Sequence, residues 1–192
     1  MKLNQPYYLN TNFGYQTNGK GRNFSFDTGK GYKNLGFNVG LSHIKIGDRH
    51  APSYSLTNSG KEEKGFNIGL HYHLSNFDIK FYYSFVDVNL ALLRSSIFHS
   101  GNAISRAISS EEPLFIRPFS YVINEPNQLV DHHLAKVNIN WWYNENDKLS
   151  FIFGRQLNKR KEFDVRRNAE KPIIDLDLIT TDLMIDWDHS FS

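Results

Sequence analysis

Residues 65–85 read GFNIGLHYHLSNFDIKFYYSF, and apolar and polar side chains alternate through both halves of this stretch. Because successive side chains of a β-strand point to opposite faces, each half is predicted to be a strand with one apolar and one polar face. The Ser75-Asn76 pair between them has the length of a tight hairpin turn. The apolar positions are Phe66, Ile68, Leu70, Tyr72, Leu74, Phe77, Ile79, Phe81, Tyr83 and Phe85.

The same alternation predicts eight strands along the chain. Their expected ranges are 6–16, 22–28, 34–46, 64–74, 77–86, 131–144, 148–158 and 176–188. Helical spacing of apolar residues occurs only over 101–110, where Ala103, Ile104, Ala107 and Ile108 recur. The predicted fold class is therefore all-β, with antiparallel strands joined up and down by sequential hairpins.

Strand length and loop length favour a membrane barrel over a soluble sandwich. Strands of about ten residues suit a tilted crossing of a bilayer. The connections at 29–33, 75–76 and 144–147 are short, whereas those at 47–63, 87–130 and 159–175 are long. Outer-membrane barrels show this asymmetry, and their long loops are extracellular. The expected fold is a transmembrane β-barrel segment of about eight strands, a partial barrel.

Aromatic residues gather at the end that carries the short turns. They are Tyr72, Phe77, Trp141, Trp142, Tyr143 and Trp187, which include every Trp of the chain. Trp and Tyr collect where a membrane meets water. A soluble sandwich with an aromatic core is the competing interpretation, but core aromatics would not collect at one end of the strands.

In a membrane barrel the apolar face is expected to face lipid, and Asp78, Lys80, Asn138 and Asn140 are expected to face inward. Arg155 and His43 fall on the apolar face. Each is expected near a strand end, where it reaches the interface, or at a bulge.

Composition limits the other function classes. The chain has 192 residues, about one domain, and its net charge of +2 gives no case for a nucleic-acid partner. It has no cysteine, and no stretch approaches the ~20 apolar residues of a membrane helix. Residues 1–6 lack the apolar core of a signal peptide, so the sequence is interpreted as a mature form or a piece of a longer chain.

Several stretches resemble the barrel of TonB-dependent outer-membrane receptors. They are residues 47–48, 54–56, 58–60, 124–126, 130–136 and 153–167. The resemblance implies a 22-stranded barrel with an N-terminal plug domain that contacts the TonB complex. It also implies uptake of ferric siderophores, ferric citrate, cobalamin or glycans across the outer membrane of a Gram-negative cell. Residues 1–192 correspond to part of that barrel, without the plug, so transport by this piece alone is not expected.

Charged loop residues supply the candidate ligand site. Lys159, Arg160, Lys161, Arg166 and Arg167 lie in a predicted extracellular loop. Of these, Arg160, Arg166 and Arg167 are the candidates for binding an anionic iron chelate, because guanidinium groups bind carboxylates in a bidentate way. The alternative is an exposed rim that pairs with nearby acids or meets the phosphates of lipopolysaccharide.

No metal site, cofactor or catalytic residue is predicted. His71, His73, His132 and His133 offer pairs of imidazoles but no third ligand at a fixed spacing. Asp182, Asp186 and Asp188 lack a partner base, and Gly29-Lys30-Gly31 lacks the Ser or Thr of a phosphate loop. Two other functions stay open: a self-contained eight-stranded structural or adhesive barrel, and a secreted carbohydrate-binding sheet.

Overall fold

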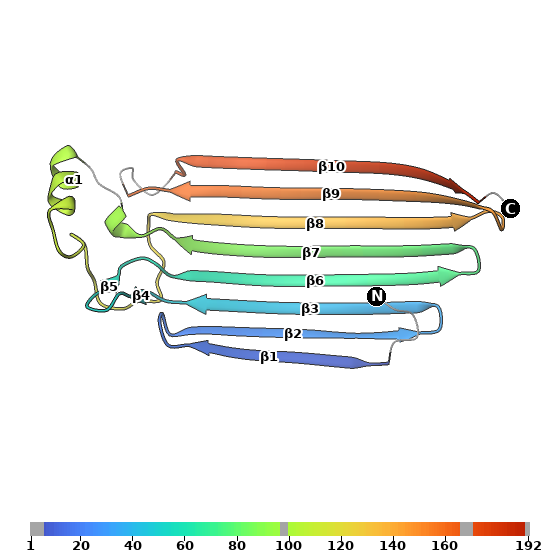
Figure 1. The fold of residues 1–192 in the computed structure, drawn as a ribbon, viewed down its shortest axis with the longest axis horizontal. Helices are drawn as coiled ribbons and strands as arrows, with labels where there is room; N and C mark the ends of the chain where they lie inside the picture. The colour runs from blue at the N-terminus through green and yellow to red at the C-terminus, as the bar shows by residue number, and fades with distance from the viewer. Residues whose placement is uncertain (1–5, 97–99, 166–170, 191–192) are drawn as a thin grey trace.

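One antiparallel sheet of eight strands forms the protein, as the computed structural model shows for residues 6–96, 100–165 and 171–190 (Figure 1). The strands are β1 (Tyr8–Gln16), β2 (Gly21–Tyr32), β3 (Leu35–Ile46), β6 (Lys61–Leu74), β7 (Phe77–Ala91), β8 (Asn127–Trp142), β9 (Asp147–Phe163) and β10 (Ile174–His189). Their order in the sheet follows the chain, so each strand pairs with the strands of this sheet that come before and after it in the sequence. The predicted all-β fold with sequential antiparallel strands is confirmed.

The sheet is a single layer. Extensive contacts occur only between strands that are adjacent in it, and no second layer covers either face of the described strands (Figure 1). In the described part of the chain β1 and β10 are open edges and do not pair with each other. A closed barrel is therefore not formed by these eight strands.

The connections differ in length at the two ends of the sheet. Residues 33–34, 75–76 and 143–146 make the short turns at one end. The loops 47–60 and 92–126 lie at the other end, with the small sheet of β4 (Arg49–His50) and β5 (Ser55–Leu56) (Figure 1). The four-residue turn between β1 and β2 also lies at the long-loop end, as an exception to the asymmetry.

Most strands extend further toward the long loops than predicted. The expected ends at 86 in β7, 131 in β8 and 158 in β9 are wrong, because these strands run to Ala91, from Asn127 and to Phe163. The physical reason is a change of phase. Beyond Phe85 the apolar side chains of β7 are Val86, Val88 and Leu90. They lie on the opposite face from Phe77, Ile79, Phe81, Tyr83 and Phe85.

The phase changes at the same level in several strands. In β3 the apolar set passes from Leu41 to Ile44 and Ile46, and in β10 Ile174, Leu176 and Leu178 lie opposite in phase to Ile179. The pairing register places Leu41, Phe66, Phe85, His133, Leu157 and Ile179 in one row across the sheet. The apolar face of the sheet thus ends at a common row.

The predicted turn at 29–33 is also wrong. Residues 29–32 belong to β2, and the turn is Lys33-Asn34, where Lys33 has φ of 49°. Each of the three short turns accepts a backbone hydrogen bond from the end of the strand beside its hairpin. The carbonyls of Asn34, Asn76 and Asn146 accept from the amides of His73, Trp142 and Ser190, at 2.8, 3.0 and 2.8 Å.

Helical structure is confined to the longest loop. The helix predicted over 101–110 is α1 (Gly101–Ile108), and the Ser100 hydroxyl caps it by accepting from the Ala103 amide at 3.3 Å. A short 3₁₀ turn, η1 (Arg94–Ser96), precedes it. Among the described residues, no helix has the length and apolar character needed to cross a membrane.

The turn before β9 provides a test of the fold at the short-turn end. Asp147 accepts hydrogen bonds from Asn144 Nδ2 at 2.7 Å, His189 Nδ1 at 2.6 Å and Trp187 Nε1 at 3.0 Å. The bonds from Asn144, His189 and Trp187 lower the pKa of the Asp147 carboxyl below its ordinary value, against a smaller opposing effect of desolvation. This carboxylate therefore ties the last strand to the turn.

We expect Asp147→Asn to destabilise the protein in a pH-dependent way. A lowered folded-state pKa adds stability that is present above the unfolded value of about 3.9 and is lost as pH falls through the folded pKa. The loss in free energy of unfolding should be largest at neutral pH and shrink below about pH 4. Urea unfolding across this range measures it, with Asp188→Asn, which opens an exposed pair with Lys148, as the control. The same pH profile in both variants would contradict this role of Asp147.

Candidate functional site

The apolar side chains of six adjacent strands, β3 and β6 to β10, occupy one face of the sheet. Directly paired residues share a face, and the register pairs Phe81 with Leu70 and Val137, and Val137 with Phe153. The residues predicted to share the apolar face all do so: Phe66, Ile68, Leu70, Phe77, Ile79, Phe81, Val137, Ile139, Phe151 and Phe153. We call these positions and their row neighbours on the other strands the apolar band.

The apolar band is uncovered in this chain. Ala91 is the sole buried hydrophobic residue in the described part of the structure, whereas Leu70 is 41% and Leu183 61% exposed. The accessible surface is 12665 Å², whereas a compact monomer of this mass exposes roughly 9,400 Å². The sheet therefore has no hydrophobic core of its own.

The opposite face is polar and more crowded. Its buried residues include His71 and Asp78, at 7% exposure each, and Ser150 at 8%. Asp78 is paired with His71 and accepts from Lys80 Nζ at 3.0 Å. Asp78, Lys80, Asn138 and Asn140 share this face through the register, as predicted.

The aromatic residues at the short-turn end interact with one another and with polar partners. Phe77 and Trp141 stack with ring centroids 5.6 Å apart, and Tyr143 packs against Trp141 at the same distance. Trp187 donates to Asp147. Trp142 lies on the polar face, paired with Lys148, so this aromatic group includes one residue that does not belong to the apolar band.

The expectation for Arg155 is wrong. Arg155 lies in the middle of β9, paired with Thr181 and Ala135 in an uninterrupted register, and marks neither a strand end nor a bulge. It sits one row below the end of the apolar band, on the same face as the apolar residues. His43 lies in the first row beyond the band, consistent with the predicted interface position.

At the long-loop end, Asp48 joins the loop 47–60 to the loop 92–126. Its carboxylate accepts from the amides of Ser59 at 3.1 Å and Ser120 at 3.2 Å, and its own amide donates to the Ser120 carbonyl at 2.9 Å. Asp48 is 3% exposed. These bonds satisfy the buried carboxylate and fix the two loops together.

Asn58 and Thr57 complete this junction. Asn58 Nδ2 donates to the carbonyls of Leu92 and Pro126, both at 2.8 Å, and Asn58 Oδ1 accepts from the Asn124 amide at 3.0 Å. The Thr57 hydroxyl accepts from the Arg117 amide at 2.7 Å. Residues 47–48, 58–60 and 124–126, which carry part of the resemblance, therefore meet in one cluster, which we call the loop junction.

A cavity of about 320 Å³ opens beside the loop junction. Its lining includes Arg94, Arg117 and Phe115, and the two guanidinium carbons lie 4.8 and 4.7 Å from the Phe115 ring centroid. Sequence reasoning missed this cavity, because neither arginine stands in a recognisable pattern and they are brought together only by the fold of the longest loop.

Of the three predicted ligand-binding arginines, the described structure contains Arg160. Arg160 lies on β9, where its Nε donates to Glu162 Oε1 at 3.1 Å, and its side chain is 47% exposed. This is the paired rim arrangement named as the alternative. Arg166 and Arg167 lie outside the described residues.

The histidines are engaged by other side chains. His71 and His73 both face Asp78, and His133 Nδ1 lies 2.8 Å from the Tyr83 hydroxyl. Among the residues that the structure describes, no group of three or more His, Asp or Glu side chains is arranged to hold a metal ion. His132 and His133 point to opposite faces of β8, so they do not converge.

Comparison with known proteins adds no relative: no family model, curated protein or solved structure matches this chain. Functional argument therefore depends on the apolar band, the loop junction and the charges around them.

We expect the loop junction to depend on the Asn58 side chain. Asn58→Gly keeps a residue that tolerates the φ of 60° but removes three hydrogen bonds from buried backbone groups. Unmet bonds of this kind cost ~1–3 kcal/mol each. Limited proteolysis within 92–126 should accelerate, while the far-ultraviolet spectrum of the sheet stays unchanged. Lys33→Gly, at another positive φ without such bonds, is the control, and equal protection of the loop in both variants would contradict the role of Asn58.

Proposed function

We propose that this chain is part of the wall of an outer-membrane β-barrel of the TonB-dependent receptor type. The observation that carries the membrane part of the proposal is the apolar band, which spans six adjacent strands, keeps part of its surface accessible and is covered by no other described part of the chain. A mostly apolar face of this width is unfavourable in water and favourable against hydrocarbon.

The height of the apolar band supports lipid as its cover. In β7 it runs from Phe77 to Phe85, eight steps of about 3.4 Å, or roughly 27 Å along the strand. A tilt of about 40° reduces this to roughly 21 Å, close to the ~25 Å band of outer-membrane barrels. Acidic and basic residues replace the apolar ones in the next row, where Lys64, Asp87 and Asp131 stand.

The apolar band also shifts along the strands toward the long loops at β1 and β2. Lys30 of β2 shares a row with Phe37 and Phe81, well inside the band of the central strands. Phe13 and Phe24, in contrast, extend one row beyond the end of the band at Leu41. The band is thus oblique to the hydrogen-bonded rows only at β1 and β2, whereas from β3 to β10 its end follows a single row.

The open edges favour a piece of a larger barrel over a self-contained one. An eight-stranded barrel requires β1 to pair with β10, and the described strands do not pair in this way. Unpaired backbone groups at an edge are costly in hydrocarbon, so further strands would have to cover both edges. Eight strands amount to about a third of a 22-stranded wall.

The receptor assignment rests on the resemblance, and three of the resembling loop segments are in contact at the loop junction. The proposed partners are outer-membrane lipid, lipopolysaccharide, an iron chelate at the loops, and the TonB complex through a plug domain. A coding sequence that specifies a plug and further strands beside this one would support the receptor. A neighbouring sequence without them would favour an independent barrel.

The membrane proposal predicts that the same substitution has different effects at two adjacent aromatic residues. Phe81 lies in the middle of the apolar band, and Tyr82 lies on the polar face. Phe81→Arg should make the free energy of insertion less favourable by ~2–4 kcal/mol, as found for arginine at the bilayer midplane, while Tyr82→Arg should change it little. Folding into phosphatidylcholine vesicles, followed by tryptophan fluorescence and protection from protease, measures both. Equal penalties would overturn the assignment of the faces.

The ligand proposal predicts a contribution from the loop arginines. Replacing all three of Arg160, Arg166 and Arg167 by Ala should weaken the binding of ferric citrate at low salt. The attraction between exposed charges is strongest there, because salt screens it. Titration calorimetry at low and high salt measures the change, with Arg155→Ala as a control outside the loops. Unchanged affinity would remove these arginines from the site and favour the cavity lined by Arg94 and Arg117.

A further inference from the structure

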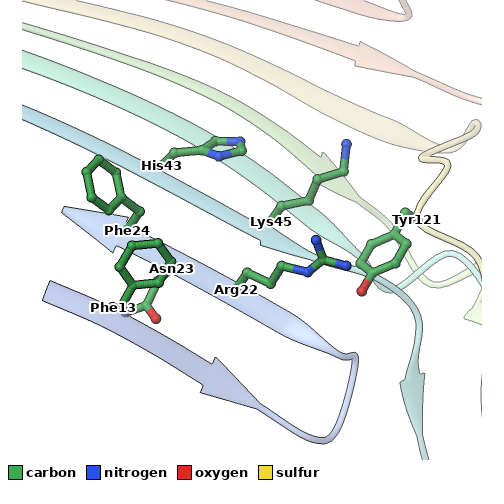
Figure 2. A pocket seen from close by; sticks show the side chains of 7 residues that line it. All are labelled: Phe13, Arg22, Asn23, Phe24, His43, Lys45 and Tyr121. Carbon is green, nitrogen blue, oxygen red and sulfur yellow. The ribbon is translucent and has the colours of Figure 1, made fainter.

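A pocket of about 520 Å³ opens across β1, β2 and β3, where the apolar band meets the long-loop end (Figure 2). Phe13 and Phe24 form one end of it, with ring centroids 5.2 Å apart. Figure 2 shows Arg22, Lys45 and Tyr121 at the other end, with Arg22 extended toward Tyr121, and His43 above Phe24. One pocket thus joins an aromatic end to a cationic end.

The register shows how these two ends are stacked along the strands. Phe13, Phe24 and His43 occupy one row, and Arg22 and Lys45 occupy the next row toward the loops. Rows on one face are about 7 Å apart along a strand. The cations therefore lie immediately beyond the last apolar row, at the level where a lipid headgroup begins if the apolar band lies in the membrane.

Arg22 has a guanidinium group available for an anion. Its Cζ lies 5.8 Å from the Tyr121 ring centroid, and within the described chain no carboxylate pairs with it. Tyr121 is fixed in turn by its hydroxyl, which donates to the Lys20 carbonyl at 2.8 Å. A guanidinium held by an aromatic ring presents its donor edge to a phosphate in bidentate geometry.

Glu62 partly offsets the remaining cations. It lies 3.1 Å from Lys45 Nζ, 3.2 Å from His43 Nε2 and 3.8 Å from Lys64 Nζ. We call the two rows beyond the apolar band on this face the rim. On the rim, β2, β3 and β6 carry one carboxylate, that of Glu62, against three cations, Arg22, Lys45 and Lys64. The rim of β7–β10 has the reverse balance, with Asp87, Asp131, Asp175 and Asp177 against Lys159 and Lys161. Positive charge on the rim is therefore concentrated at the pocket.

We propose that this pocket binds a phosphate-bearing membrane lipid, with the phosphate at Arg22 and Lys45 and an acyl chain along Phe13 and Phe24. The inference rests on the proposed function, since it needs the apolar band to lie in a bilayer. A soluble phosphate lacks a group for the aromatic end, and a zwitterionic lipid gains less from the excess of cations. The two ends together therefore select an anionic lipid.

The test is lipid retention by the full chain. The chain is reconstituted in vesicles of equal parts phosphatidylglycerol and phosphatidylcholine with the same acyl chains, extracted into mild detergent and analysed by native mass spectrometry. Phosphatidylglycerol should be retained about fivefold over phosphatidylcholine, the effect of roughly one basic side chain at an anionic headgroup. The variant R22Q/K45Q should retain both lipids equally.

A matched control removes the same charge from the same rim. K159Q/K161Q lies outside the pocket and should keep the preference. Equal retention of the two lipids by the wild-type chain, or loss of preference in the control as well, would overturn the site. Displacement of the lipid by glycerol phosphate at equal concentration would overturn the part played by Phe13 and Phe24. The proposed membrane function fails on a different result, in which a barrel completed by further strands at both edges does not insert into pure phosphatidylcholine vesicles, so the two failures are distinguishable.

Discussion

The structure depends on the covering of one face of a single-layer sheet. The ladder hydrogen bonds lie within the sheet and join each strand only to its neighbours, so they do not remove the apolar band from water. Apart from Ala91 and Pro126, the described apolar side chains keep part of their surface accessible, so contacts between neighbouring strands remove apolar surface from water only in part. A cover over the apolar band would remove the rest and add to the stability of the sheet.

The change of phase along the strands divides the sheet into two zones. Below the row of Phe85 the apolar side chains point to the face of the apolar band, and beyond it Val86, Val88 and Leu90 point to the other face. In the second zone the strands carry charges outward and approach the loop junction, where Asp48 and Asn58 bind the loops through buried polar bonds. The loops are thus held by buried hydrogen bonds within the chain, whereas the apolar face of the strands depends on what covers it.

The sequence allowed the eight strands and their faces to be predicted, because alternation at a period of two is a local signal. It did not allow the strand ends to be predicted where the phase changes, since Val86–Leu90 breaks the pattern without ending the strand. The loop junction was out of reach for a different reason. The partners of Asn58 lie 34 to 68 residues away, and no local pattern announces contacts of that separation. The pocket of Phe13 and Arg22 likewise requires the register of three strands.

The two edges restrict what completes the sheet. β1 runs toward the long loops and β10 runs toward the short turns, because eight antiparallel strands reverse direction an odd number of times. A strand that pairs with β10 in antiparallel fashion must therefore run toward the long loops, and one that pairs with β1 must run away from them. Any added wall that meets both conditions contains an even number of strands, as single-chain bacterial barrels do. On the polar face of β10, Asp182 and Asp186 stand opposite Gly154 and Ser150, so β9 offers them no cation. The edge strand β10 thus carries two carboxylates on its polar face that face no cation of β9, and β1, which has no Lys or Arg, does not supply one.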